Sequence, residues 1–488
     1  MQSENSLRNL ESFGSVAAED DAVLEYFLTT DAVQRLRNND AFLVLGRKGS
    51  GKTALVRHFT EGVGVSLSKS LNLRGYPWGV HTQRIDRGAS DIEAYVSSWR
   101  YLIAVEVAAL VLSRTERPQF QNVIDLTIFF KDNYGGPSPK LADILRPRKL
   151  RMTRLSFQPA VLGNKLVEID LERSSGDIQL GVELNALSTA IINIAIEVAK
   201  NESMGPITLH FDELDQGLSR IDRDRSLLLV GLILASRELR RECRQVEYSI
   251  NPIVYLRTDL WDDLEFSDKN KISESAALHL DWSSESLSHL TGERIKAKVS
   301  ATASWEDIAS PGLMRGSQSK WNHVIARTFL RPRDVIKFLN SALSKSKMRL
   351  DEPLIFENQD IVNARDEYST YLKKELDDEI LPHWPKWEQA LQTCSTIGTL
   401  NFDREQFVKV YRSKVSNDND VSAEDALSLL YRFSVIGYEK RSGYGGSYWV
   451  FQYTHAEAGW DGAASKFKVH LGLKEYAKLN ESREARQT

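Results

Sequence analysis

Residues 46–53 have the sequence GRKGSGKT and fit the pattern G-x-x-x-x-G-K-[ST]. Glycines at these positions let successive backbone N–H groups converge on phosphate oxygens. Lys52 would then reach the outer phosphates, and the Thr53 hydroxyl would coordinate Mg²⁺. The stretch therefore predicts a phosphate-binding loop for ATP and Mg²⁺, with a chance Gly-rich turn as the alternative. The residues expected to bind the nucleotide are Gly46, Arg47, Lys48, Gly49, Ser50, Gly51, Lys52, Thr53 and Ala54.

The segments on either side of this loop are the ones that a phosphate site requires. Residues 41–45, AFLVL, form a continuous apolar run typical of a buried parallel strand. Residues 52–62, KTALVRHFTEG, favour a helix whose N-terminus faces the anion. We therefore expect strand, loop and helix in that order.

A second stretch, PITLHFDELDQG at residues 206–217, adds the chemistry of hydrolysis. An apolar strand over 207–211 ends in Asp212, which can hold Mg²⁺ through water, and in Glu213, which can orient and deprotonate the attacking water. A phosphotransferase would not normally activate water here. The alternatives are a helix N-cap for Asp212 and a solvated loop for Glu213. His210, inside the apolar strand, is expected to be a hydrogen-bonded core residue.

In a third stretch, an apolar run over residues 253–256 is followed directly by Arg257 and Thr258. Open α/β sheets bind ligands at the carboxyl ends of their strands, so Thr258 could sense the γ-phosphate. A turn before a helix is the alternative. Downstream, Lys269 or Lys271 could complete a neighbouring subunit's site in trans, or could belong to a solvated loop.

The fourth stretch is TFLRPRDVIKFLNSAL, in which Pro332 suits the first position of a helix. Arg333 would then point out from the first helical turn, where a positive charge opposes the helix dipole. Binding of the γ-phosphate from a lid is our explanation for this charge, and a surface ion pair is the alternative.

Together the four stretches resemble those of AAA+ ATPases, and more narrowly of the bacterial P-loop ATPases near the origin-recognition and STAND groups. The resemblance covers most of the chain, but thinly between about residues 115 and 185. The further phrases that carry it are FGSVAAEDDAVLEYFLTT, YPW, FDELDQG, FLRPRD and FKVHLGLKEY.

The resemblance implies an α/β fold, a P-loop NTPase of ASCE type with an AAA+-like parallel sheet. A small helical lid and a C-terminal winged-helix-like domain would follow. Arg257 is an alternative to Thr258 as the sensor, and Arg331 to Arg333 as the lid arginine. The implied metal-binding residues are Thr53 and Asp212, and the implied catalytic residues are Lys52, Glu213, Thr258 and Arg333.

The resemblance also implies a function, that of an ATP-hydrolysing switch or assembly ATPase that belongs to a bacterial anti-phage defence system and controls a partner effector. Members of such families are often encoded in bacterial anti-phage defence or mobile-element loci, where they control an effector. A homo-oligomer formed through the nucleotide sites and a companion effector protein are the implied partners. The alternatives are a nucleic-acid-binding loader or motor, a nucleotide-bound scaffold and a phosphotransferase.

Composition narrows the class of protein. The chain has 488 residues with a formal net charge of −4, so a wholly basic surface for nucleic acid is excluded. Its two cysteines, Cys243 and Cys394, suit a reducing compartment. No apolar run approaches the roughly 20 residues that span a bilayer, and the first residues do not resemble a signal peptide. We expect a cytoplasmic protein without a membrane partner.

The pattern along the chain suggests several domains. Residues 91–112 predict one helix with a broad apolar face. Alternation in VEIDLE and IQLGVEL, on either side of RSSGD, predicts a hairpin within an inserted module. The expected division is an ATPase core at 1–290 with an insert at 115–185, a lid at 291–372, a linker at 373–400, a winged-helix-like domain at 401–476 and a flexible tail at 477–488.

Two segments bear on nucleic acid. Residues Arg146 to Arg154, RPRKLRMTR, could track a phosphate backbone or an acidic partner, or form a solvated loop. In the expected winged helix, two helices near 404–413 and 422–433 precede two strands and a Gly-rich turn. The second of these helices begins with acidic residues, so we expect it to contact protein rather than DNA.

Overall fold

The computed structural model describes most of the chain, and the contacts of the described residues divide it into two compact units. The sheet unit comprises Thr29–Arg47 and Lys52–Leu280. The C-terminal unit comprises Met1–Leu28, Lys48–Gly51 and Asp281–Thr488. The described residues are 6–62, 67–73, 91–145, 180–214, 223–415, 421–443 and 445–481.

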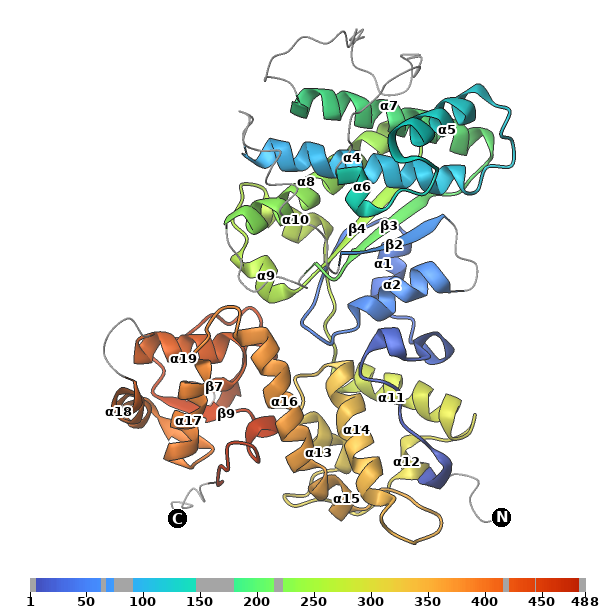
Figure 1. Ribbon diagram of the computed structural model, residues 1–488. Coiled ribbons are helices and arrows are strands. Elements are labelled where there is room, and N and C mark those ends of the chain that lie inside the picture. Colours follow the sequence, from blue (N-terminus) through green and yellow to red (C-terminus); the bar gives the residue numbers. More distant parts are fainter. Residues whose placement is uncertain are drawn as a thin grey trace. The chain divides into compact units, whose positions relative to one another are not determined.

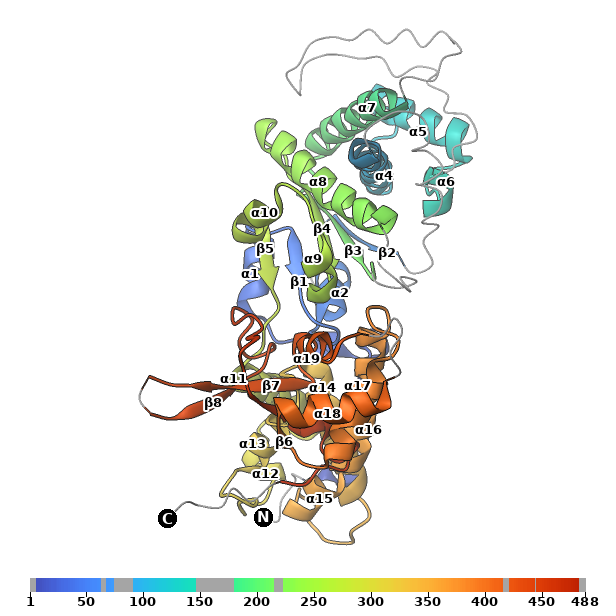
Figure 2. The same ribbon diagram turned by 90° about the vertical axis from the view of Figure 1, so that its left-hand side faces the viewer.

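The sheet unit is built on five parallel strands in the order β2-β3-β4-β1-β5. Figure 1 labels β2, β3 and β4, and Figure 2 labels all five strands. The three central strands are almost wholly buried, as parallel strands covered on both faces must be. Strands β3 and β4 contain the apolar runs that the sequence marked as strands, and β1 covers residues 43–45 of the predicted run 41–45, so the three predicted strands are present. The strands are β1 (Leu43–Leu45), β2 (Ser68–Asn72), β3 (Ile207–Asp212), β4 (Ile250–Leu256) and β5 (Ala277–His279).

The helices of this unit cover the sheet, and α4 packs against α7 and α8 (Figure 2). The predicted helix over residues 91–112 is confirmed as α4, and the aromatic Trp99 on its apolar face is fully buried. The helices are α1 (Asp31–Arg37), α2 (Lys52–Glu61), α4 (Asp91–Leu112), α5 (Gln121–Tyr134), α6 (Leu141–Leu145), α7 (Leu180–Asn201), α8 (Arg223–Gln245), α9 (Thr258–Asp263) and α10 (Lys269–Ala276).

Helix α4 corrects one expectation from the sequence. Among the described helices it is the one long and apolar enough to cross a membrane, with a mean hydropathy of 1.4 over its most apolar window. In the structure 83% of that window is buried inside the protein, as in the core helix of a soluble domain. Two of its charged residues are paired within the unit, Arg100 with Glu242 and Glu106 with Lys69.

The predicted hairpin is wrong where it can be compared. Residues 180–184, expected in its second strand, form the first turns of α7. The run of alternating residues is short, whereas the apolar residues that follow it repeat with a helical period and are buried along α7. The rest of the hairpin, the basic run Arg146 to Arg154 and the YPW phrase lie outside the described residues.

The C-terminal unit consists of helices and a small antiparallel sheet in the order β6-β9-β7-β8. Strands β7 and β8 form a hairpin that projects from the helices (Figure 2). The strands are β6 (Asn401–Asp403), β7 (Ile436–Arg441), β8 (Ser447–Val450) and β9 (Lys466–Val469). The helices are α11 (Ser284–Lys298), α12 (Trp305–Ile308), α13 (Lys320–Ile325), α14 (Pro332–Ser346), α15 (Asn358–Asn363), α16 (Arg365–Ile380), α17 (Trp387–Ile397), α18 (Arg404–Lys414) and α19 (Ala423–Arg432).

The N-terminal segment, residues 6–28, packs in the C-terminal unit, although the sequence division grouped it with residues 29–290. A buried ion pair between Arg294 of α11 and Asp21 holds it there at 2.9 Å, and the Arg294 guanidinium lies over the Tyr26 ring. Short 3-10 helices within this segment are η1 (Leu7–Asn9), η2 (Ala18–Asp20) and η3 (Val23–Tyr26), and η4 (Leu471–Leu473) follows the last strand.

Residues 373–380, where the sequence suggested that a linker begins, form the last turns of α16 instead. Their apolar members Leu376 and Ile380 are buried, so the acidic residues between them lie on a helix face. The remaining boundaries of the five-part division stay a prediction, because the contacts separate only two units.

Candidate functional site

The loop at residues 46–53 is divided between the two units. Gly46, Arg47, Lys52 and Thr53 belong to the sheet unit, and Lys48–Gly51 to the C-terminal unit. In the sheet unit, α2 begins at Lys52, so the strand, loop and helix predicted for this region are present.

The structure brings together Thr53 and Asp212, the two residues expected to hold a metal ion. The Thr53 hydroxyl donates to Oδ2 of Asp212 at 2.9 Å. Asp212 ends β3 and is 5% exposed, while Thr53 lies in the first turn of α2. One hydroxyl and one carboxylate leave room for water and phosphate oxygens, which Mg²⁺ prefers to an all-protein cage.

Lys52 lies beside the carbonyl groups of its own loop. Its Nζ donates to the carbonyl oxygens of Gly46 at 2.8 Å and Arg47 at 3.1 Å. The ammonium group therefore lies at the loop. Its position fits a cation for the phosphates.

Glu213 has an unusual backbone conformation. Its φ is +58°, in the left-handed region that a non-glycine residue seldom adopts. Such strain is held by the surrounding structure and recurs at functional sites. The turn directs the chain away from β3 immediately after Asp212. The sequence predicted the role of Glu213 from its neighbours but gave no signal of this conformation.

His210 is the core residue that the sequence led us to expect. It is fully buried, and its two ring nitrogens lie 3.0 Å from the Ser68 hydroxyl and 2.9 Å from the Tyr255 hydroxyl. Burial lowers the pKa of His210 to about 3, so the ring is neutral at physiological pH. Its hydrogen bonds connect β3 to β2 and β4.

The sensor candidates take different positions at the end of β4. Thr258 is the first residue of α9 and is partly exposed. Arg257 is buried and forms a bidentate pair with Asp259, at 3.0 and 2.6 Å. This pair occupies the Arg257 guanidinium, which favours Thr258 as the sensor.

The two lysines considered for a role in trans also differ. Lys269 begins α10, donates to the Asp262 carbonyl at 3.0 Å and lies over the Trp261 ring. Lys271 is exposed on the same helix. Its exposure makes Lys271 the better candidate.

In the C-terminal unit, Gly49 and Gly51 have φ values of +80° and +101°. A Cβ atom on Gly49 would lie 2.9 Å from the Cβ of Arg333, so this glycine permits a close approach of α14. The Arg333 Nε donates to the Val16 carbonyl at 3.0 Å, and its Nη1 lies 3.2 Å from Glu375. The ion pair with Glu375 is the alternative that the sequence left open for Arg333, and it does not exclude a phosphate.

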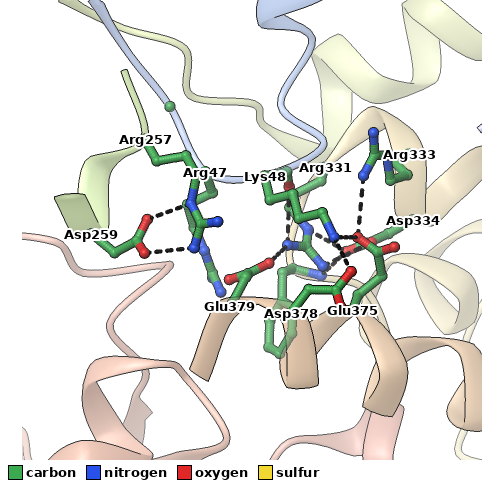
Figure 3. Close-up of polar contacts among 12 residues, drawn as sticks. Arg47, Lys48, Arg257, Asp259, Arg331, Arg333, Asp334, Glu375, Asp378 and Glu379 are labelled. Atoms are coloured by element: carbon green, nitrogen blue, oxygen red, sulfur yellow. Dashed lines mark hydrogen bonds and ion pairs between the residues drawn. The ribbon is translucent and has the colours of Figure 1, made fainter. Parts of the chain in front are cut away.

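Arg331, the other lid candidate, has a different environment (Figure 3). It is 1% exposed and forms a bidentate pair with Asp334 at 2.9 and 3.0 Å. Its Nη1 also donates to Glu379 of α16 and, at 3.0 Å, to the Lys48 carbonyl. Burial opposes the charge, but the two carboxylates outweigh it and raise the pKa of Arg331 well above its ordinary value. The commitment of its guanidinium to these partners favours Arg333 over Arg331 as the lid arginine.

Acidic residues of α16 form a group that sequence reasoning missed. The Lys48 ammonium lies 2.5 Å from Asp378 and 3.5 Å from Glu375 (Figure 3). With Glu379 they lie on one face of the helix, at positions i, i+3 and i+4. The signal was this spacing within the acid-rich run, which we assigned to a linker.

The comparisons with known proteins give three similarities. A family model described as the FunZ-associated C-terminal helical domain matches residues 285–377. A putative transposon gamma-delta 80.3 kDa protein of Escherichia coli strain K12 is 22% identical over 420 residues, which cover 82% of this chain. The chain spans 55% of that relative's length. The crystal structure of Cdc6p from Pyrobaculum aerophilum aligns over 92% of both chains, with 11% identity and a TM-score of 0.30, a likeness too remote to place the fold.

Proposed function

We propose that this chain is an ATP-binding and ATP-hydrolysing protein of AAA+ type. The hydrogen bond between Thr53 and Asp212 carries the proposal, because it joins two motifs that lie 159 residues apart in sequence. Each motif alone has a structural alternative. Their meeting at the ends of β1 and β3 is what a site for a nucleotide and Mg²⁺ requires.

The sheet supports the ASCE type. In the order β5-β1-β4-β3-β2, the strand that carries Asp212 and Glu213 is separated from the strand before the phosphate loop by β4. The strand order places Glu213 one strand away from the phosphate loop, and Glu213 would there orient the attacking water.

The residues of the loop fit a phosphate group. The Ser50 hydroxyl is buried and has no hydrogen-bond partner within the described part of the chain. Buried hydroxyl groups are nearly always hydrogen-bonded, so a phosphate oxygen is a suitable partner. Positive φ values at Gly49 and Gly51 let the loop curl around an anion.

Each residue then has a defined role. Bound Mg²⁺ would neutralise the charge that develops on the transferred phosphoryl group. Thr53 and Asp212 hold the ion, and Lys52 binds the outer phosphates. Glu213 accepts a proton from the attacking water, and Thr258 orients the reacting groups at the end of β4.

The test is the loss of nucleotide binding in Lys52→Ala. The affinity for ATP should fall by about tenfold or more, since a charge-assisted hydrogen bond to the phosphates is lost. Lys131→Ala, which removes an exposed lysine of α5 in the same unit, is the matched control. Titration calorimetry with ATP and Mg²⁺ measures both. Equal affinities in Lys52→Ala and the wild type would refute the proposal.

The wider role follows from the resemblance of the sequence motifs. We propose a switch or assembly ATPase that forms homo-oligomers through its nucleotide sites and controls a companion effector in the cytoplasm. Anti-phage defence and mobile elements are the settings that the resemblance offers. The description of the E. coli relative as a putative transposon protein favours the second of these.

A nucleic-acid-binding ATPase is the second candidate. We infer that α18, α19 and the β7–β8 hairpin form a winged-helix-like domain, supported by their order and pairing. Exposed Lys409, Arg412 and Lys414 on α18 favour contact with a phosphate backbone, whereas Glu424 and Asp425 at the start of α19 oppose it. Stimulation of ATP turnover by DNA or RNA would support this candidate, and its absence would reject it.

A further inference from the structure

Three consecutive carbonyl groups of the phosphate loop accept hydrogen bonds from residues elsewhere in the C-terminal unit. Two donors come from the start of α14, and the third is an indole N–H just before α11. The pairs are Arg331 Nη1 with the Lys48 carbonyl at 3.0 Å, the Arg333 backbone N–H with the Gly49 carbonyl at 3.4 Å, and Trp282 Nε1 with the Ser50 carbonyl at 2.8 Å.

Peptide geometry gives these contacts a consequence for the other side of the loop. In a trans peptide the C=O and N–H groups point in opposite directions. Donors that hold the carbonyls of residues 48–50 therefore direct the N–H groups of Gly49, Ser50 and Gly51 the other way. These N–H groups are the ones that the sequence pattern assigns to the phosphates.

We propose that Arg331 and Trp282 are positioning residues, which hold the phosphate loop by its carbonyl groups and so keep its N–H groups ready for a polyphosphate. This inference rests on the proposed function, and it explains how the conformation of the phosphate loop is maintained. Neither residue would contact the nucleotide. Both act through the backbone between Lys48 and Gly51.

The donors are themselves held firmly, as positioning residues must be. Arg331 is fixed by Asp334 and by Glu379 of α16. The Lys48 ammonium binds Glu375 and Asp378 of the same helix, which draws the outer side of the loop toward α16. Trp282 lies close to the loop, since a Cβ atom on Gly51 would be 4.0 Å from its ring.

Trp282→Phe removes one of these donors and keeps an aromatic ring. Without the indole N–H the loop populates more conformations, so ATP and ADP should both bind about 3- to 10-fold more weakly, the size of one net hydrogen bond. In turnover assays KM for ATP should rise by a similar factor, while kcat stays within about twofold, because the loss is uniform in ground and transition states.

Trp321→Phe is the matched control, because the Trp321 indole also makes one hydrogen bond in this unit, to the Ser284 hydroxyl at 3.1 Å. Its affinity for both nucleotides should equal that of the wild type. Unchanged affinity in Trp282→Phe, or an equal loss in both variants, would overturn the inference. If Lys52→Ala still loses ATP binding in that case, the proposed function stands without it. If Lys52→Ala binds like the wild type, the proposed function has failed.

Discussion

The acidic pair at the end of β3 and the charged network between α14 and α16 use similar residues in opposite ways. Asp212 and Glu213 follow an apolar strand directly, and Glu213 has a strained backbone. Around Arg331, in contrast, Asp334 and Glu379 surround a single guanidinium that is 1% exposed. In the first arrangement the acidic pair lies at the end of a strand, where Asp212 accepts a hydrogen bond from Thr53, whereas in the second the carboxylates fix a cation.

This difference separates the residues expected to change turnover from those expected to change stability. A carboxylate that must accept a proton works only if other groups do not neutralise it. A buried arginine is tolerated only if carboxylates and carbonyls satisfy it fully. Arg331 meets this second condition, since its hydrogen bonds also reach the phosphate loop at Lys48.

The largest expected effect is on stability, in Arg331→Met. The substitution keeps a long side chain but leaves two buried carboxylates without their cation, which should lower the free energy of unfolding by about 3–5 kcal/mol. Lys296→Met is the matched control. Lys296 also pairs at i,i+3 spacing, with Glu293, but both side chains are exposed, so its loss should cost about 1 kcal/mol or less. Urea denaturation measures the free energy of unfolding of both variants. Equal decreases would show that the burial of Arg331 does not make its ion pairs more important for stability.

The sequence predicts the first of these regions far better than the second. Thr53 and Asp212 each lie in a local pattern of strand, turn and helix, so their types and spacing were sufficient. The burial of Arg331 depends on Lys48 and Glu379, which are 283 and 48 residues away in sequence. No local pattern records such contacts.

The same reasoning explains the successes and errors in the fold. Both ends of helix α4 were predicted correctly, because its apolar residues follow a helical period over 22 residues. The alternating run is too short to compete with the helical pattern after it, and its described residues, 180–184, join α7. The packing of residues 6–28 in the C-terminal unit involves the ion pair with Arg294 and the burial of Leu7 and Phe13, and it could not be predicted from either segment alone.

The next effect tests the acidic pair. Glu213→Gln keeps the size of the side chain and removes the base, so ATP turnover should fall by about 10²-fold or more, while ATP binding is retained. Glu265→Gln, an exposed acid in the same unit, should leave turnover unchanged. Single-turnover assays with Mg²⁺ measure both variants. Turnover within about threefold of the wild type in Glu213→Gln would mean that another group activates water.

The smallest effect concerns Arg333, which shares features of both regions. Like Arg331 it pairs with a carboxylate, that of Glu375, and it also packs against the phosphate loop at Gly49. If its guanidinium binds the γ-phosphate, ATP must displace Glu375 from it, and ADP need not. A ligand shifts such an equilibrium only by its difference in affinity for the two states. Arg333→Ala should therefore shrink the ratio of ATP to ADP affinity by about tenfold, the size of one charge-assisted hydrogen bond, and should abolish ATP-specific protection of α14 and α16 in hydrogen exchange.

Glu375→Gln gives the opposite sign and so separates this role from a purely structural one. It removes the competing carboxylate and leaves Arg333 in place, so the preference for ATP over ADP should increase. Arg333 also donates a hydrogen bond to the Val16 carbonyl. If its role is structural and acts through that bond, Arg333→Ala should lower the affinities for ATP and ADP by the same factor. An unchanged ratio in Arg333→Ala would assign the residue to the N-terminal segment alone. In that case Arg333 would not bind the γ-phosphate. The charged network of α14 and α16 would then contribute to stability, and the acidic pair at the end of β3 to catalysis.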